Sequence, residues 1–394
     1  MPIKLLTVAL FATCGAAQTF VVDAANGPGT NFTDIAAAVA AVPDGATLLV
    51  RPGIYGPFSI AAKGLTLLGG PGVDVTGSGA LPPAVEVRNT AAAQSVVVSG
   101  VRLASCDGAV SVRNCAGPVL LEGVDASLGT CFLTGTRASS FGIWTCAQVL
   151  VSRCVGWNSW AANSDVVFEL CTLRGSGSYC LHGSCSHSNP GLELTGGSAQ
   201  IVSGSLTGGA GFSPLSPFSN NQPALSLIGA TARVMAPVTL DATGYAGMAP
   251  APAIAGTGSL RLDPAVVLTT TAVPAIASTV GLQTATMPTV LGQSAAPNST
   301  LFAAALGPIG DVVVLVVGLP GAAATVPGFT DAFWIDPAVH QFHAIGVPRP
   351  GVPVLGAVAV PNVAALRGLR IAWQAASIGS AGTMASNPTW TLVR

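Results

Sequence analysis

Four side chains that can bind a soft metal ion lie within one short segment. Cys180, His182, Cys185 and His187 follow the spacing Cys-x-His-x2-Cys-x-His. Two thiolates and two imidazoles can hold zinc or copper with tetrahedral geometry. In an exported protein a disulfide between two nearby cysteines is the commoner outcome. The sequence therefore leaves two interpretations open, and favours a Cys180–Cys185 disulfide over a metal site. No cofactor is expected.

Aromatic side chains gather just before that segment. Trp144, Trp157, Trp160 and Tyr179 are close in the sequence, and the middle two lie in a polar stretch. Exposed aromatic rings on an extended face can stack on sugar rings, because each ring is a rigid apolar surface with polar groups nearby. Trp157, Trp160 and Tyr179 are therefore the predicted ligand-binding residues. The alternative is that these rings pack under a loop.

The scaffold that positions these groups contains few charges. The chain has 394 residues, of which 50% are hydrophobic and 8% charged, and its formal net charge is −1. This composition excludes a coiled coil, a charged disordered tail and a polybasic nucleic-acid binder. The 48 glycines and 29 prolines interrupt every stretch that could form a long helix. We expect an all-β chain long enough for two domains.

A unit of two short alternating strands and a turn recurs along the first two thirds of the chain. Clear copies begin at Ala84, Ala109 and Gly142. An irregular period of roughly 23 to 33 residues is typical of a solenoid with loops of variable length. Parallel strands then stack about 4.8 Å apart and bury one continuous aliphatic stripe. Asn89 and Asn114 recur at one turn, where their side chains can hydrogen-bond along the axis.

Stacking also predicts which cysteines are neighbours. Eight cysteines lie in residues 106–185, an even number that indicates disulfides in a secreted chain. The alignment of the coils puts Cys154 and Cys171 at the position that Gly123 and Gly204 hold elsewhere. One strand spacing brings such Cα atoms into disulfide range. The predicted disulfides are Cys106–Cys131, Cys115–Cys146, Cys154–Cys171 and Cys180–Cys185.

Residues 1–17 have the pattern of a secretory signal peptide. Lys4 precedes the apolar run Leu5–Ala12, and small residues lead to Ala17, after which we expect cleavage. The apolar run is too short to span a bilayer comfortably. The mature protein is therefore expected to be secreted or held at the cell surface, without an integral membrane span.

The front of the chain resembles right-handed parallel β-helix proteins of the pectin-lyase-like superfamily. Phe32–Gly45 (FTDIAAAVAAVPDG), Leu48–Phe58 (LLVRPGIYGPF) and Lys63–Gly70 (KGLTLLGG) carry the resemblance. It implies a right-handed parallel β-helix over residues 18–264 and a helix that caps its open end. The predicted helix has Asn31 or Thr33 as its N-cap.

A second module is expected after an Ala/Pro/Thr-rich linker over residues 265–288. About seven short strands with Gly/Pro turns predict a small antiparallel β-sandwich over residues 289–394. This part resembles the C-terminal β-domain of many secreted bacterial repeat proteins. The matching segments are Gly318–Gly321 (GLPG), Phe333–Pro337 (FWIDP) and Gly368–Ala375 (GLRIAWQA).

Polysaccharide lyases, polygalacturonases and pectin methylesterases share the β-helix that the resemblance implies. The polygalacturonase motifs Asp-Asp, Gly-His-Gly and Arg-x-Lys are absent from the sequence, and Lys63 is the one lysine after the predicted signal peptide. The segment around Asp165 and Glu169 weakly resembles the esterase motif, but its residues are out of register with that motif. With Arg153 or Arg174 from adjacent coils, these carboxylates are the candidate catalytic residues. The alternative is that all four are solvated turn and edge charges.

These observations favour an exported, disulfide-stabilised β-helix protein with a structural or carbohydrate-binding role and no catalysis. Polysaccharides or cell-surface components are the expected partners, and nucleic acid is not. One alternative is a carbohydrate-active enzyme, a lyase or esterase of the pectin-lyase-like superfamily. A metal-binding loop protein is the other.

Overall fold

The computed structural model describes residues 18–77, 83–104, 108–127, 139–177, 179–181, 184–186, 188–211, 220–380 and 382–394. Apart from a few N-terminal residues, the chain divides into two compact units, with the boundary between Met287 and Pro288. The predicted signal peptide and the predicted pair Cys106 and Cys131 lie outside the described residues. No described helix is long and apolar enough to cross a membrane.

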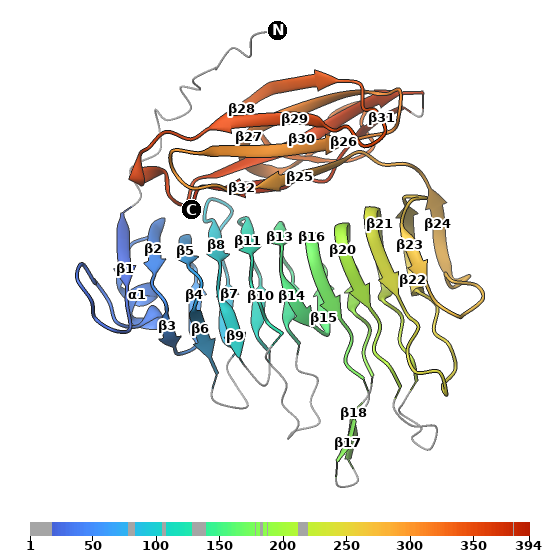
Figure 1. Ribbon diagram of the computed structural model, residues 1–394, viewed down its shortest axis with the longest axis horizontal. Coiled ribbons are helices and arrows are strands. Elements are labelled where there is room, and N and C mark those ends of the chain that lie inside the picture. The colour runs from blue at the N-terminus through green and yellow to red at the C-terminus, as the bar shows by residue number, and fades with distance from the viewer. Residues whose placement is uncertain are drawn as a thin grey trace. The chain divides into compact units, whose positions relative to one another are not determined.

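The first unit is a parallel β-helix whose coils follow one another in chain order from β1 to β24 (Figure 1). Each full coil passes through three parallel sheets, and each strand pairs with its equivalent in the next coil. The first sheet contains β4 (Phe58–Ala61), β7 (Val85–Arg88), β10 (Val110–Arg113), β12 (Phe141–Trp144), β15 (Ser159–Ala162) and β19 (Leu192–Thr195).

The second and third sheets complete the coils. The second contains β1 (Thr19–Val22), β2 (Ala46–Val50), β5 (Leu65–Gly69), β8 (Val96–Ser99), β11 (Val119–Glu122), β13 (Val149–Ser152), β16 (Asp165–Arg174) and β20 (Ser198–Thr207). The third contains β3 (Gly53–Tyr55), β6 (Val73–Thr76), β9 (Arg102–Ala104) and β14 (Val155–Trp157). The ends of β16 and β20 continue into the third sheet, and β21 (Leu225–Asp241) runs through all three.

Strict register explains the aliphatic interior. Val110 of β10 lies between Val85 of β7 and Phe141 of β12, and all three are at most 3% exposed. Side chains alternate along a strand, so the residues that follow Val85, Val110 and Phe141 in their own strands face outward. The predicted fold class is confirmed: an all-β chain with a parallel β-helix followed by an antiparallel β-sandwich.

One short helix, α1 (Ile35–Ala41), lies at the N-terminal end of the solenoid (Figure 1). It buries Ile35, Ala38 and Val39. Asp34 is its N-cap and accepts hydrogen bonds from the backbone of the first turn, so the prediction of Asn31 or Thr33 was wrong. Asn31 instead accepts a hydrogen bond from the Val21 backbone N–H, at 2.8 Å.

In the turn between the first and second sheets, the residue at one recurring position has a left-handed backbone conformation. Asn89, Asn114, Thr145 and Asn163 have φ angles of 56°, 53°, 56° and 48°. Asparagine tolerates this region better than most residues. The Asn114 amide donates to Asn89 Oδ1 at 3.4 Å, which confirms the predicted ladder.

Residues expected to form a linker belong partly to the solenoid. β23 (Val267–Thr269) pairs with β21, and β24 (Val280–Thr284) pairs with β22 (Ile254–Leu262). Only Val280 of β24 is buried, so no alternating hydrophobic pattern reveals this strand in the sequence. The parallel pairing therefore extends 20 residues beyond the predicted end at residue 264, to residue 284.

The second unit is a sandwich of two antiparallel sheets. One contains β25 (Thr289–Gln293), β26 (Thr300–Leu306) and β29 (Val354–Ala359); the other contains β27 (Val312–Ala324), β28 (Phe333–Gly346), β30 (Arg370–Gly379), β31 (Gly382–Ala385) and β32 (Thr389–Leu392). A short 3-10 helix spans Ala364–Leu366. Leu301 and Val313, from different sheets, share a core with Trp373.

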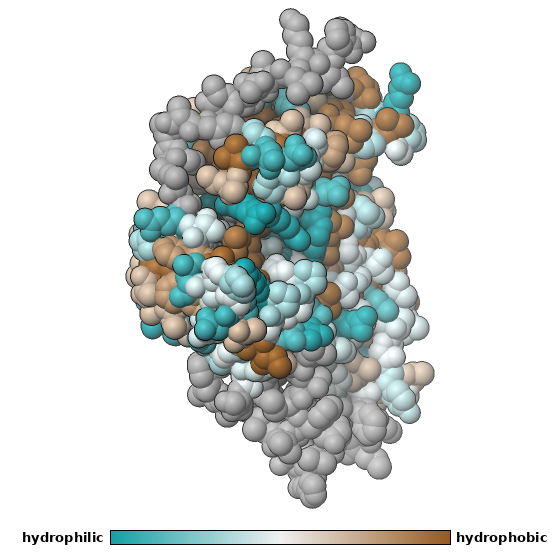
Figure 2. All heavy atoms as spheres, turned by 60° about the vertical axis from the view of Figure 1, so that its left-hand side comes forward, coloured by the Kyte–Doolittle hydropathy of each residue, from teal (hydrophilic) through white to brown (hydrophobic). Residues whose placement is uncertain are grey.

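The low charge of the chain is visible at its surface. On the side drawn in Figure 2, hydrophilic and hydrophobic residues are interspersed. Exposed apolar side chains occur in both units, among them Ile54 and Phe342. Single exposed apolar residues of this kind are normal and do not by themselves mark an interface.

The predicted disulfides Cys115–Cys146 and Cys154–Cys171 are not formed in the structure. The coils stack each pair as expected, but all four residues are buried free cysteines. Each thiol instead donates to the carbonyl oxygen two residues earlier in its own turn, at 3.2–3.4 Å. The stacked side chains therefore satisfy their hydrogen bonds without a bridge.

Cys154 and Cys171 are opposite each other, but the predicted equivalence of Cys154 with Gly123 was wrong by one residue. Cys171 lies opposite Gly204, as predicted, but Cys154 lies over Val124, whose N–H donates to its sulfur at 3.4 Å. Gly123 corresponds instead to Arg153, and both have positive φ angles, 60° and 54°. Arg153 adopts a backbone conformation that favours glycine, so residue type alone misplaced the equivalence.

Candidate functional site

The outward side of the first sheet carries a continuous strip of aromatic and charged residues. We name it the tryptophan face and define it as Glu86, Arg88, Arg113, Trp144, Trp160 and Glu193. The strand registers arrange these residues in two adjacent columns. Arg88, Arg113 and Trp144 form one column, and Glu86, Gly142, Trp160 and Glu193 lie in the other.

Two indole rings are stacked at the centre of this face. The ring centroids of Trp144 and Trp160 lie 5.1 Å apart, with an interplanar angle of 16°. Gly142, the residue opposite Trp160 in the next coil, makes this possible. A Cβ atom at Gly142 would lie 3.1 Å from Cζ2 of Trp160, which is tighter than most carbon contacts. The missing side chain thus leaves the space through which Trp160 reaches Trp144.

Charged groups continue the strip on one side of the indoles. The Arg113 guanidinium carbon lies 6.0 Å from the ring centroid of Trp144, within cation–π range. Arg113 also forms an ion pair with Glu86, and Arg88 Nε lies 3.2 Å from the same carboxylate. Glu86 therefore holds two arginines in place beside the aromatic pair.

A hollow of about 190 Å³ adjoins Trp160 on the other side. Asn158, Asn189 and Glu193 supply polar groups to its wall. Both amides are held in position: Asn158 Oδ1 accepts from Ser176 N–H at 2.6 Å, and Asn189 Nδ2 donates to Ser176 Oγ at 2.9 Å. An aromatic wall with a few fixed polar groups is the usual composition of a site for a small polar ligand.

Two hydroxyl groups in the wall of this hollow have no hydrogen-bond partner among the described residues. They are the buried Oγ atoms of Ser139 and Ser159. Buried hydroxyl groups without a partner cost free energy, so most are satisfied by protein, water or a ligand. This is a second sign, independent of the indoles, that the hollow accommodates polar atoms.

The predicted binding residues are divided between two sheets. Trp160 lies on the tryptophan face, whereas Trp157 lies on the third sheet opposite Arg174, whose guanidinium carbon is 5.8 Å from its ring centroid. The side chain of Tyr179 lies outside the described residues. Trp144 belongs to the aromatic group in the sequence, but only the coil register shows that it is the partner of Trp160.

The four candidate catalytic residues do not converge on one site. Arg153 and Glu169 are neighbours, since Arg153 N–H donates to the Glu169 carbonyl at 2.8 Å. Asp165 accepts a hydrogen bond from Ser198 Oγ at 2.6 Å, and Arg174 lies over Trp157. The Arg153–Glu169 adjacency agrees with the prediction from neighbouring coils, and the sequence reasoning missed Glu122 beside them.

Glu122 completes a buried polar group on the second sheet. Its carboxylate lies 3.9 Å from Arg153 Nη1 and 3.5 Å from Ser99 Oγ. Glu122 and Glu169 are 1% and 0% exposed. Arg153 and Glu122 therefore link two successive coils of the second sheet.

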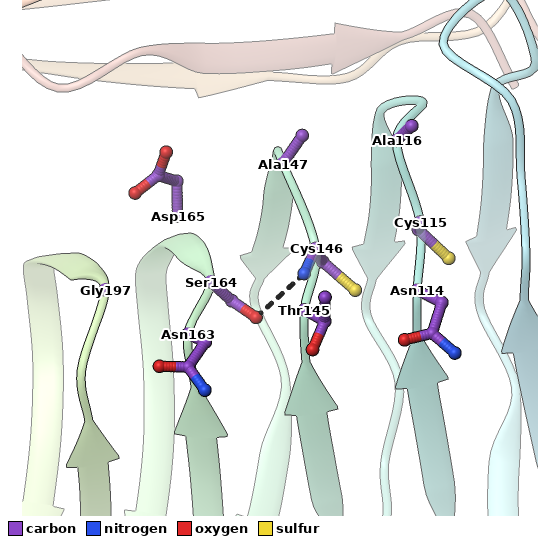
Figure 3. Close-up of a pocket in the computed structure, with 10 residues that line it drawn as sticks. All are labelled: Asn114, Cys115, Ala116, Thr145, Cys146, Ala147, Asn163, Ser164, Asp165 and Gly197. Carbon is purple, nitrogen blue, oxygen red and sulfur yellow. Dashed lines mark hydrogen bonds between the residues drawn. The ribbon is translucent and has the colours of Figure 1, made fainter.

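A larger hollow of about 540 Å³ follows the turns between the first and second sheets (Figure 3). Its lining includes Cys115, Cys146, Ser164 and Asp165. Ser164 Oγ accepts a hydrogen bond from Cys146 N–H at 3.0 Å, which links two successive turns.

The Cys/His segment is described only in part. β17 (Tyr179–Leu181) and β18 (Ser184–Ser186) form an antiparallel pair in which Cys180 lies opposite Cys185. This backbone register is compatible with the predicted Cys180–Cys185 disulfide. His182 and His187 lie outside the described residues, as do the side chains of both cysteines. Elsewhere in the described chain, no group of three or more His, Cys, Asp or Glu residues could hold a metal ion.

Comparisons with known proteins add little to this geometry. No protein-family model matches the chain, and no curated protein matches it. Among solved structures it is similar to pectate lyase Pel9A, with 14% sequence identity and a TM-score of 0.31. The similarity covers 67% of this chain and 78% of that chain. The registers of its own strands identify the first unit as a parallel β-helix.

Proposed function

We propose that this chain is an exported carbohydrate-binding protein that receives a glycan chain on its tryptophan face without cleaving it. The stacked pair of Trp144 and Trp160 beside the polar hollow is the observation that carries this proposal. Sugars present apolar C–H faces and a rim of hydroxyl groups. An aromatic surface with fixed amides next to it complements both parts of such a ligand.

The shape of the strip favours an extended ligand. The tryptophan face runs over β7, β10, β12, β15 and β19, which are neighbours in the first sheet. Four strand spacings of about 4.8 Å make it about 19 Å long. A chain of a few sugar units laid along the solenoid axis would contact Trp144 and Trp160 centrally, and Arg113 and Glu193 on either side.

The placement of the carboxylates supports binding without turnover. Glu86 and Glu193 are four strand spacings apart on the tryptophan face, about 19 Å. Glycosidases need two carboxylates within about 5–10 Å across the scissile bond. Lys63, a candidate proton acceptor for a lyase, instead donates to the carbonyl oxygens of Val39 and Val42 at 2.8 and 2.6 Å. It therefore ties helix α1 to the solenoid.

Binding can be tested with a glycan array followed by calorimetry on the best ligand. Trp144→Ala and Trp160→Ala should each weaken binding about fivefold or more, since stacking on an aromatic ring contributes on the order of 1 kcal/mol or more. Trp157→Ala is the matched control, because it removes an indole from another sheet, and it should leave affinity unchanged.

The same protein should be incubated with uronate and neutral polysaccharides while product formation is followed. Binding without turnover agrees with the proposal. Turnover, or equal affinity of all three tryptophan variants, would overturn it. Export is tested separately by the mass of the protein recovered outside the cell, which should begin after Ala17.

A further inference from the structure

Two pairs of stacked thiols occur in the solenoid, and they differ in their surroundings. Cys115 and Cys146 follow Arg113 and Trp144 by two residues, and those residues are partners in register. The Ala147 N–H donates to the Cys115 carbonyl at 2.8 Å, so the turns stay in contact beyond the strands. Figure 3 shows both sulfur atoms projecting to the same side of the stack.

The first pair lines the 540 Å³ hollow. Cys115 and Cys146 are 1% and 3% exposed, and both line this hollow. The adjacent Cys146 side chain lowers the pKa of Cys115 to about 6. The same contact raises the pKa of Cys146. Of the two thiols, Cys115 therefore loses its proton more readily than Cys146.

The second pair does not line this hollow, although Cys171 is 4% exposed. Cys154 is 0% exposed, and desolvation by burial raises its pKa well above the ordinary value. Its sulfur lies against backbone groups, accepting from Val124 N–H and donating to the Ser152 carbonyl. Cys171 donates to the Val151 carbonyl at 3.2 Å. A buried thiol with a raised pKa, such as that of Cys154, reacts slowly with disulfides.

We propose that Cys115 and Cys146 form a thiol–disulfide exchange site that takes a small-molecule disulfide through the turn hollow. The Cys115 thiolate attacks one sulfur of the external disulfide, forming a mixed disulfide and releasing one thiolate. The Cys146 thiol then loses its proton to solvent, and its sulfur attacks the Cys115 sulfur. This step forms the Cys115–Cys146 bond and releases the second thiolate. The external disulfide is reduced to two thiols while the protein pair is oxidised.

Oxidation would join the coil of β10 to that of β12. These coils carry Arg113 and Trp144, which are already in contact on the outward side. A covalent bond between the turns fixes their spacing. The exchange site does not depend on the proposed glycan binding, since the thiols and the tryptophan face lie on different parts of each coil.

The experiment uses the full mature chain, reduced with dithiothreitol under native conditions and then freed of reductant. Glutathione disulfide is added, samples are quenched with acid and alkylated, and each cysteine peptide is assigned by mass spectrometry. We expect the Cys115–Cys146 pair to oxidise at least about tenfold faster than Cys154–Cys171, because thiolate fraction and access control the rate. The second pair should react at a comparable rate only in denaturant.

Single variants test the direction of attack. In Cys146→Ser, a glutathione adduct should accumulate on Cys115. In Cys115→Ser, Cys146 should form its adduct much more slowly, and Cys154→Ser should behave like the unaltered protein at the first pair. Circular dichroism checks that each variant is folded. Equal oxidation rates of the two pairs, resistance of both until unfolding, or a preferred adduct on Cys146 would each overturn the proposal.

Discussion

The β-helix and the β-sandwich bury their interiors in different ways. In the β-helix, each coil adds aliphatic side chains directly over those of its neighbour, as Val112 lies over Val87 and under Ile143. In the sandwich, strands that are far apart in the sequence meet around Trp373, which is 0% exposed. The interior of the β-helix consists of similar stacked layers, whereas the interior of the sandwich is packed around one central residue, Trp373.

Hydrogen bonds between polar side chains and their partners follow the same division. Asn114 in the β-helix bonds to Asn89, one coil away. Asn387 in the sandwich accepts from the N–H of Val290 at 2.8 Å and donates to its carbonyl at 2.7 Å, across 97 residues of sequence. In a solenoid each layer contacts only its neighbours, so losses stay local. Single substitutions should therefore cost more in the sandwich than in the β-helix.

The largest effect is expected at the centre of the sandwich. Trp373→Ala should lower the free energy of unfolding of that unit by about 3–5 kcal/mol, because it leaves a large cavity. Ile143→Val in the β-helix should cost only about 0.5–1.5 kcal/mol. Hydrogen exchange followed by mass spectrometry over a urea series reports each unit separately. Equal losses of protection in the two units would contradict the comparison.

A smaller loss is expected at Asn387. Asn387→Ala leaves the N–H and the carbonyl of Val290 buried without partners. We expect a destabilisation of about 2–3 kcal/mol, the usual cost of such unsatisfied groups. The same exchange measurement should show the loss at β25 first. If hydrogen-exchange protection at Val290 does not change, the Asn387 side chain does not stabilise the Val290 backbone.

Substitution in the asparagine ladder should lower the free energy of unfolding less than substitution of Asn387. Asn114→Ala keeps a side chain at a φ angle of 53° but removes the hydrogen bond to Asn89. The expected cost is about 1–2 kcal/mol, mainly from the left-handed backbone. Asn114→Gly is the matched variant, because glycine adopts this conformation readily, and it should cost less than the alanine variant. Urea unfolding curves of the two variants test this order.

The smallest effect concerns the ion pair of Asp74 and Arg102. The hydrogen bond from Arg102 lowers the pKa of Asp74 below its ordinary value of 3.8. A carboxyl whose pKa is lower in the folded state contributes stability above its unfolded pKa and loses it as the pH falls through the folded pKa. Because the pair is partly exposed, we expect less than about 1 kcal/mol.

An NMR titration of Asp74 checks this last prediction. In the unaltered protein its carboxyl should titrate below 3.8, and in Arg102→Met it should return towards that value. The loss of stability below about pH 4 should become correspondingly smaller in the variant. An unchanged titration curve would show that another group holds the pKa down.

The sequence predicts much of the fold because its signals are local. Alternating strands, recurring turns and the Phe32–Gly45 segment indicated the β-helix and its helix, and Gly/Pro-spaced strands indicated the sandwich. The last coil was not predicted from the sequence, because β24 buries only Val280. Cys154 was correctly aligned with Cys171 but wrongly aligned with Gly123, because Arg153 adopts the backbone conformation that glycine usually adopts at this position.

The sequence by itself determined the repeated unit, the low charge and the stock of aromatic and thiol side chains, because these depend only on residue type and short-range order. Tertiary structure decided which of them meet. Trp144 and Trp160 are 16 residues apart, and Cys115 and Cys146 are 31 apart, so no common spacing marks either pair. Loops of different length set the register of each coil. The register places the two indoles diagonally on neighbouring strands and the two thiols one strand spacing apart.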